Sequence, residues 1–405
     1  MGNQATSSHQ PANVPADRVV DFDIYQPFSA TPDFHRAWAD LRDGTSHKIV
    51  WTPHNEGHWI ALDPALISTV LTDSRQFSNR IVLVPKSTAG EAYSELIPLS
   101  LDPPVHRPYR KILDDKLFGS AVNPLEDGVR TLTISLIEGF RAQGRCNFVH
   151  DFAEKLPLLA FMRLVDLPVA DLPQLKHLAD QFTRPDGSIT PAEASAQFRT
   201  YLAPILAERK GSDRPDLLSH IADGRIGDRP ITETEAVNLA SQVLVGGLDT
   251  VVNFMSFAML TLAAMPSLQQ HIATHPDAIP DAMNELLRRL PIVSSGREVV
   301  DNIEIDGVTL AKGQIVIAST VLFSLDPSIN ENPYEIDLDR QFKKTVIFGA
   351  GRHTCPGQFL ARIEIRALLE EWFKRIPSVR LAPGQTIHHH GGITAGTDPF
   401  VLEWG

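Results

Sequence analysis

The chain has 405 residues, of which 43% are apolar and 21% charged, so it can build a large globular core. Its 37 Lys and Arg against 49 Asp and Glu give a formal net charge of −12, which argues against a nucleic-acid-binding protein. Two cysteines in 405 residues exclude a disulfide scaffold and indicate a reducing, cytoplasmic setting. In chain order, polar residues 1–20 predict a flexible N-terminal arm, followed by one domain over residues 21–405.

The next segments alternate between β and helical patterns. Apolar runs on either side of Asn55-Glu56-Gly57 predict a β-hairpin. Helical spacing dominates from about residue 123 to 290, and a second β region with a turn at Asp306-Gly307 follows. Short strands are expected around the glycines of residues 388–405. These patterns predict a mainly α protein with small β regions (α+β).

Residues 236–265 form a long apolar stretch that could span a bilayer by length alone. Asn238, Asp249 and Asn253 interrupt it, and the chain has no second such stretch. We therefore expect a central helix buried in a soluble protein, with no membrane partner.

The most informative segment is FGAGRHTCPG, residues 348–357. It precedes an amphipathic helix, and Cys355 therefore lies at a helix N-terminus, where backbone N–H groups favour a thiolate. Nearby glycines allow the backbone to approach a large flat ligand. A thiolate ligand donates electron density to haem iron and favours O–O cleavage. A buried structural cysteine or a cysteine nucleophile are the alternatives.

This segment resembles the cysteine signature of the cytochrome P-450 superfamily, through Phe348, Gly351, His353, Cys355 and Gly357. His353, in place of the more common Arg, is similar to the bacterial camphor-hydroxylase branch. The resemblance implies a single-domain, monomeric enzyme with haem b held by Cys355 and a long central helix over the haem. It assigns Phe348 and Gly351 to the haem site.

Three further motifs occur in the order that this resemblance requires. Glu285 and Arg288 share one helix face, and the resemblance implies that they pair with Arg340 to stabilise the core beneath the cysteine loop. Residues 99–111 are similar to the family's helix that crosses the haem. The residues implied to hold the haem propionates are His106, Arg110, Arg297 and His353.

Gly246 and Gly247 lie inside the long apolar helix, where each costs about 1 kcal/mol relative to Ala. A ligand lying against the backbone would offset this cost, and close helix packing is the alternative. Splitting dioxygen consumes two protons. The resemblance implies that Asp249 relays them, that Thr250 holds an ordered water, and that the glycines, Gly246 among them, make room beside the iron.

The substrate pocket is inferred by matching motifs to the camphor-hydroxylase branch. Leu83 stands where that branch has an aromatic residue, and Gln242 and Thr394 replace apolar ones, so we expect a different substrate, a terpenoid or norisoprenoid. Arg80 replaces an acid that helps to bind a monovalent cation there, so we expect no such site. The predicted pocket residues are Leu83, Tyr93, Phe182, Thr183, Gln242, Val245, Val293, Ile393 and Thr394.

The resemblance implies that electrons come from a [2Fe–2S] ferredoxin, itself reduced by an NADH-dependent ferredoxin reductase. The predicted docking surface is a basic patch on the cysteine side, which would steer an acidic partner. Its residues are Arg75, Arg107, Arg110, Lys111, Lys343 and Arg352. The expected function is a haem-thiolate monooxygenase that hydroxylates a small apolar substrate. A peroxide-driven peroxygenase and a non-catalytic haem sensor or carrier are the alternatives.

Overall fold

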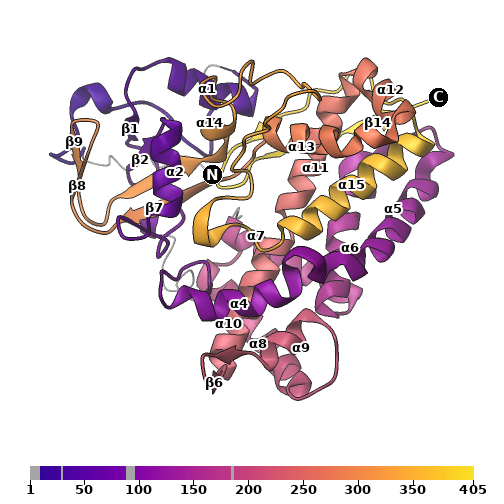
Figure 1. The fold of residues 1–405 in the computed structure, drawn as a ribbon, viewed down its shortest axis with the longest axis horizontal. Coiled ribbons are helices and arrows are strands. Elements are labelled where there is room, and N and C mark those ends of the chain that lie inside the picture. The colour runs from indigo at the N-terminus through magenta and orange to yellow at the C-terminus, as the bar shows by residue number, and fades with distance from the viewer. Residues whose placement is uncertain (1–9, 29–30, 88–95, 184–186) are drawn as a thin grey trace.

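The computed structural model describes residues 10–28, 31–87, 96–183 and 187–405. Helices fill one side of the molecule, and the main sheet lies at the other side (Figure 1). The fold is mainly helical with small sheets in one domain, which confirms the predicted class.

The main sheet has five strands in the order β1-β2-β10-β7-β3, and it joins the two predicted β regions. The predicted hairpin is confirmed, because β1 and β2 pair antiparallel with Val50 opposite Ile60. β2 also pairs parallel with β10, although more than 250 residues separate them. The bounds are β1 Ile49–Thr52, β2 His58–Ala61, β3 Phe77–Ser78, β7 Ser294–Val299 and β10 Ile315–Ser319.

Smaller antiparallel sheets of two or three strands complete the β structure. The predicted turn at Asp306-Gly307 is confirmed, with φ values of 52° and 77°. The expected strands of the C-terminal tail are present. The bounds are β4 Arg145–Asn147, β5 Arg225–Ile226, β6 Arg229–Pro230, β8 Ile303–Ile305, β9 Val308–Leu310, β11 Arg380–Leu381, β12 His389–His390, β13 Gly396–Thr397 and β14 Val401–Glu403.

The helices begin at capping residues that the sequence supplies. Asp33 and Asp63 each accept a backbone N–H at the start of α1 and α2, and Thr190 and Thr232 form capping boxes at α8 and α10. The bounds are α1 Phe34–Asp43, α2 Pro64–Thr72, α4 His106–Leu117, α5 Glu126–Arg141, α6 Lys155–Val165, α7 Leu172–Thr183, α8 Pro191–Arg209, α9 Leu217–Ala222, α10 Glu233–Gly247, α11 Thr250–Ala263, α12 Pro266–Thr274, α13 Ile279–Arg289, α14 Thr320–Ser324 and α15 Gln358–Arg375.

The central apolar stretch is long enough to span a membrane, but 72% of its most apolar window is buried inside the molecule. This supports the predicted core helix. The helix is not continuous, however, because it breaks between α10 and α11 at Leu248 and Asp249. Asp249 leaves the helical conformation, and the Asn253 side-chain amide donates to its carbonyl oxygen at 3.1 Å.

The end of the predicted flexible arm is packed against the sheet. Val14 and Arg18 are buried, and Val19 forms a parallel bridge with Trp51. Arg18 Nη1 donates to the Ile49 carbonyl at 3.2 Å and pairs with the Asp306 carboxylate. Residues 14–20 are therefore held by long-range contacts that their polar composition does not reveal, and the domain begins before residue 21.

Candidate functional site

The cysteine loop turns sharply between the sheet and α15. Gly349 and Gly351 have φ values of 72° and 67°, which side chains rarely tolerate. A Cβ on Gly351 would also lie 3.1 Å from Thr72. The Cys355 N–H donates to the Phe348 carbonyl at 2.8 Å, so the loop folds back on itself and presents Cys355 just before α15.

Burial raises the pKa of the Cys355 thiol, and this effect outweighs two opposing ones. The N–H groups of Gly357 and Gln358 and the charge of Arg110 lower that pKa. Among the groups of the chain itself, burial thus opposes the predicted thiolate, whereas the helix N-terminus and Arg110 favour it. A nearby positive centre, such as a metal ion, would supply the missing stabilisation.

Four basic side chains from three parts of the chain gather near this loop: His106 and Arg110 on α4, Arg297 on β7, and His353. The His106 and His353 rings lie 4.3 Å apart, and Arg110 Nη1 donates to the Arg352 carbonyl at 3.3 Å. Burial lowers the pKa of His106 to about 4, of His353 to about 3 and of Arg297 to about 10. We call these four residues the basic cluster.

Three buried nitrogen atoms of the basic cluster have no hydrogen-bond partner within the described residues: Arg297 Nε, His106 Nε2 and His353 Nε2. Arg297 Nη1 is partly satisfied by Ser295 Oγ at 2.9 Å and the Gly296 carbonyl at 2.7 Å. Other buried side-chain atoms of the described residues also lack a partner, but three such nitrogens gather here beside Cys355, and this clustering favours a ligand that accepts hydrogen bonds. The donor set fits a ligand with carboxylates, such as a porphyrin with two propionates, beside Cys355.

The two glycines of α10 have different surroundings. A Cβ on Gly247 would lie 2.4 Å from the Phe161 ring, so this glycine allows close packing between α10 and α6. A Cβ on Gly246 would meet only Gln242 Nε2, at 3.6 Å, and Gly246 is exposed although the three residues before it are buried. Packing thus explains Gly247, whereas Gly246 borders open space. Asp249 is buried and Thr250 half-buried at the break that follows.

Comparison with known proteins settles the family. The chain is 50% identical to CYP101J2 in its crystal structure, with a TM-score of 0.91 over 98% of this chain and 100% of that one. The chain belongs to the cytochrome P450 family. The cytochrome P450 CYP101C1 is 36% identical, with a TM-score of 0.89 and the same coverage. The family model "Cytochrome P450" matches residues 192–376.

A curated relative agrees over the full length. "Probable cytochrome P450 127A1" from Sinorhizobium fredii is 29% identical over 97% of this chain and 96% of its own. The protein is therefore a P450 monooxygenase that uses haem b, of the type found in the CYP101 structures.

The structure brings most of the predicted pocket residues into two groups. Val293 and Thr394 form an antiparallel bridge, and the Ser294 N–H donates to the Ile393 carbonyl at 2.9 Å. Leu83 follows Val82, whose carbonyl accepts the Gly296 N–H at 2.8 Å, so it joins this first group.

The second group lies where α7 packs on α10. Phe182 on α7 and Val245 on α10 are buried, and Gln242 on α10 is half-buried. Thr183 is the last residue of α7. Tyr93 lies outside the described residues.

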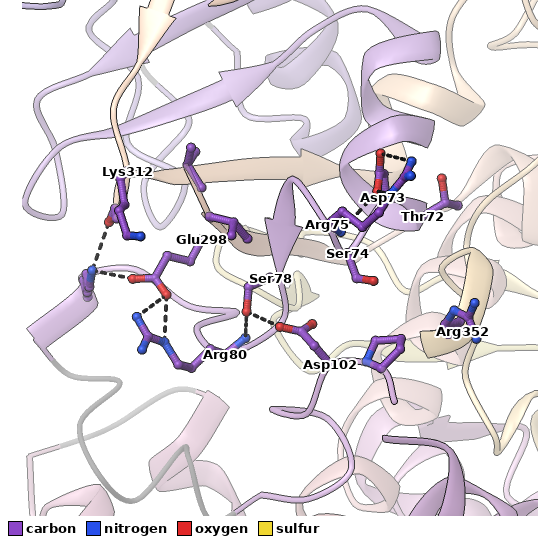
Figure 2. Close-up of a pocket in the computed structure, with 15 residues that line it drawn as sticks. Thr72, Asp73, Ser74, Arg75, Ser78, Arg80, Asp102, Glu298, Lys312 and Arg352 are labelled. Carbon is purple, nitrogen blue, oxygen red and sulfur yellow. Dashed lines mark hydrogen bonds and ion pairs between the residues drawn. The ribbon is translucent and has the colours of Figure 1, made fainter. Parts of the chain in front are cut away.

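The P450 also has an open polar pocket of about 1170 Å³ that sequence reasoning missed (Figure 2). It lies at the end of α2, beside β3 and β7, and reaches Arg352 of the cysteine loop. None of the predicted substrate residues lines it. The paired charges in its wall, such as Arg80 with Glu298, come from distant parts of the sequence, and no local pattern signals them.

The predicted Glu285–Arg288–Arg340 group is assembled in the core. Glu285 and Arg288 have fully buried side chains and make two hydrogen bonds of 2.8 Å, and Arg340 Nε donates to Glu285 Oε1 at 3.0 Å. Arg288 also donates to the carbonyls of Pro333 and Glu335, each at 2.7 Å. We call Glu285, Arg288 and Arg340 the core ion cluster.

Proposed function

We propose that this P450 hydroxylates a small apolar molecule, a terpenoid or norisoprenoid, with dioxygen and two electrons from a [2Fe–2S] ferredoxin. The observation that carries the proposal is the set of unsatisfied buried donors in the basic cluster beside Cys355. The break in the central helix at Asp249 supports it further. We also propose that the enzyme is a cytoplasmic monomer.

In this proposal the Cys355 thiolate ligates the iron, and His106, Arg110, Arg297 and His353 hold the haem propionates. Phe348, Gly351 and Gly246 would line the space that the ring occupies. Bound haem supplies the reduction of dioxygen and the insertion of one oxygen atom into a C–H bond. The second oxygen atom leaves as water, which consumes two protons.

Asp249 and Thr250 are proposed to deliver those protons. The helix break removes Asp249 from regular helical geometry, and we propose that an ordered water binds at this break beside the Thr250 hydroxyl. The Asp249 carboxylate passes protons to this water, and the Thr250 hydroxyl holds it by hydrogen bonds. A Thr250→Ala variant should consume NADH and release peroxide with little product. Tightly coupled hydroxylation by that variant would refute this role.

The proposed substrate site combines the two groups of pocket residues with Tyr93. Leu83, Phe182, Val245, Val293 and Ile393 are apolar, which suits a hydrocarbon skeleton. Gln242, Thr394 and Thr183 add polar groups to this site, and Tyr93 is proposed to donate a hydrogen bond to an oxygen atom of the substrate. A panel of terpenoids and norisoprenoids, scored by the optical shift on binding, tests this, and camphor binding as tightly as the best norisoprenoid would contradict it.

The proposed ferredoxin surface differs from the predicted basic patch. Four of its six cations pair with carboxylates of this chain: Arg75 with Asp73, Arg110 with Asp114, Lys111 with Asp115 and Lys343 with Asp281. Arg107 and Arg352 have no carboxylate within salt-bridge distance among the described residues, and both are exposed. Charge steering therefore rests on fewer residues than the sequence suggested.

An apolar feature lies beside Arg107. Phe118 is 54% exposed, packs edge-on against Phe359 at 4.8 Å, and lines a hollow of about 520 Å³ with Arg107. Phe359 is four residues from Cys355, so a ferredoxin bound here would be close to the proposed iron ligand. Arg107→Glu should slow reduction at least tenfold at low salt and leave substrate binding unchanged. Equal reduction rates would exclude this surface.

The central experiment is the carbon monoxide spectrum of the reduced protein. Thiolate ligation gives a strongly red-shifted band, and Cys355→Ser should abolish both this band and product formation. Turnover with NADH, ferredoxin and its reductase distinguishes a monooxygenase from a haem sensor. Turnover that requires added peroxide instead would indicate a peroxygenase.

A further inference from the structure

Glu298 is a buried carboxylate next to a residue of the basic cluster. It follows Arg297 on β7, and its side chain is 5% exposed. Successive side chains of a strand point to opposite faces, so Glu298 and Arg297 serve different sides of the sheet. Glu298 lies in the wall of the polar pocket (Figure 2).

Two cations from one short segment hold this carboxylate. Arg80 reaches Glu298 Oε2 through Nε at 2.8 Å and Nη2 at 2.6 Å. Lys86 Nζ donates to Glu298 Oε1 at 2.8 Å and to the Gly313 carbonyl at 2.9 Å. Each carboxylate oxygen therefore has its own cation, which is the arrangement that a buried charge requires.

Arg80 and Lys86 bracket residues 81–85, which include Leu83 of the proposed substrate site. The middle of this segment is also attached: the Val82 carbonyl accepts the Gly296 N–H at 2.8 Å, and the Val84 carbonyl accepts the Tyr25 hydroxyl at 2.7 Å. A Cβ on Gly296 would lie 3.2 Å from the Val82 carbonyl carbon. The segment therefore lies directly against β7, with an ion pair at each end.

We propose that Arg80, Glu298 and Lys86 form a positioning network that sets Leu83 against β7 and so tunes substrate affinity and product selectivity. The inference rests on the proposed function of Leu83 in the substrate site. The network couples the strand of Arg297 to the Leu83 segment, so the haem side and the substrate side of the site share one rigid support.

The three side chains of the network differ in exposure, and this difference decides which variant separates a positioning role from a role in global stability. The Glu298 side chain is 5% exposed, so removing both cations leaves a buried carboxylate without a partner and should lower the free energy of unfolding. The Arg80 and Lys86 side chains are 67% and 43% exposed, so Glu298→Gln leaves these two cations in water and should move the segment without unfolding the protein.

The test uses the haem-loaded enzyme with the best substrate of the panel. Glu298→Gln and the double variant Arg80→Gln/Lys86→Gln should each raise the substrate dissociation constant about five- to twentyfold and broaden the product distribution. The carbon monoxide band should stay at the wild-type position. In the Glu298→Gln background, removal of both cations should change the dissociation constant by less than about twofold, because the network is already broken.

Lys312→Ala is the matched control. Lys312 lines the same pocket and pairs with Asp301 at 3.1 Å, but its side chain has no bond to residues 80–86. Its removal should leave substrate affinity unchanged. If the double variant fails to fold because the Glu298 carboxylate is left unpaired, Glu298→Gln still carries the test.

Two results would overturn the proposal. One is wild-type affinity and selectivity in both Glu298→Gln and the double variant. The other is a further loss of substrate affinity in the Glu298→Gln background, as large as the loss that removal of both cations causes in the wild type. A wild-type protein without the red-shifted band, or without any substrate shift, would instead refute the proposed function itself.

Discussion

The core ion cluster and the basic cluster both bury charge, but they differ in how that charge is satisfied. Glu285 and Arg288 are fully buried, and their bonds to each other, to Arg340 and to backbone carbonyls stay within the chain. In the basic cluster, Arg297 Nε and His106 Nε2 are buried without acceptors among the described residues. Buried charge that the chain satisfies stabilises the fold, whereas several unmet nitrogens gathered beside Cys355 fit a ligand that accepts hydrogen bonds.

The largest effect is expected from the core ion cluster. Glu285→Gln removes the carboxylate charge that Arg288 and Arg340 share, and should lower the free energy of unfolding by about 3–5 kcal/mol, with or without haem. Denaturant titration measures it. Asp40→Asn, which breaks an exposed pair with Arg36, is the control and should cost less than about 1 kcal/mol. If Glu285→Gln lowers the free energy of unfolding no more than Asp40→Asn does, the contrast between the core ion cluster and the basic cluster is wrong.

Arg297→Gln should have opposite effects on the stability of the haem-free protein and on the binding of haem. The haem-free form should be as stable as the wild type or more so, because a desolvated guanidinium with an unmet donor is removed. Haem binding should weaken by about 1.5–3 kcal/mol, the value of a charge-assisted hydrogen bond. Denaturant titration of the haem-free form and haem transfer to a scavenger protein measure the two effects. A strongly destabilised haem-free form would place Arg297 with the core cluster.

Gly246 and Gly247 of α10 show the same contrast between a residue needed for packing and a residue that borders the ligand site. Gly247→Ala forces a Cβ into the Phe161 ring and should cost about 1–3 kcal/mol of stability. Gly246→Ala has room and should leave the haem-free protein unchanged or stabilise it by up to about 1 kcal/mol. It should nevertheless impair dioxygen-dependent turnover. Thermal unfolding together with turnover checks both, and normal turnover in Gly246→Ala would separate this glycine from the haem site.

The smallest expected effect is on how the stability of the protein depends on pH. Burial lowers the pKa of His106 and of His58 from 6.5 to about 4, so the folded protein resists their protonation. Their contribution to stability is present above about pH 6.5 and is lost as the pH falls towards 4, because the unfolded chain takes up the protons first. His106→Gln should flatten this loss in the haem-free form more than in the haem-loaded form. His58→Gln should flatten it equally in both.

Unfolding free energy measured between pH 7 and 4 tests this prediction. An identical effect of His106→Gln in the two forms would show that haem does not contact the His106 ring.

Local signals explain what the sequence predicted well. The hairpin and the Asp306-Gly307 turn follow from residues that tolerate positive φ, and the helices follow from apolar spacing. The Glu285–Arg288 pair lies within one helical turn, so spacing alone brings the two side chains together. The family resemblance added Arg340, which spacing could not supply.

The features that the sequence did not reveal all depend on distant contacts or backbone detail. Arg18 meets Asp306 across 288 positions, and Arg80 meets Glu298 across 218. The break at Asp249 is a backbone conformation inside an apolar pattern that continues on both sides. The basic patch was overestimated because counting cations does not show which ones already have carboxylate partners. The roles of the site residues stay predictions.

The parallel pairing of β2 with β10 has a consequence for biosynthesis. Strand His58–Ala61 can pair with strand Ile315–Ser319 only after the later strand has been synthesised. The central sheet therefore cannot form completely until about three quarters of the chain has left the ribosome. Arg297 and Cys355 also lie in the last third of the chain. Cofactor capture is therefore a late event, and a nascent chain stalled before residue 300 would expose an incomplete sheet to aggregation and chaperones rather than to haem.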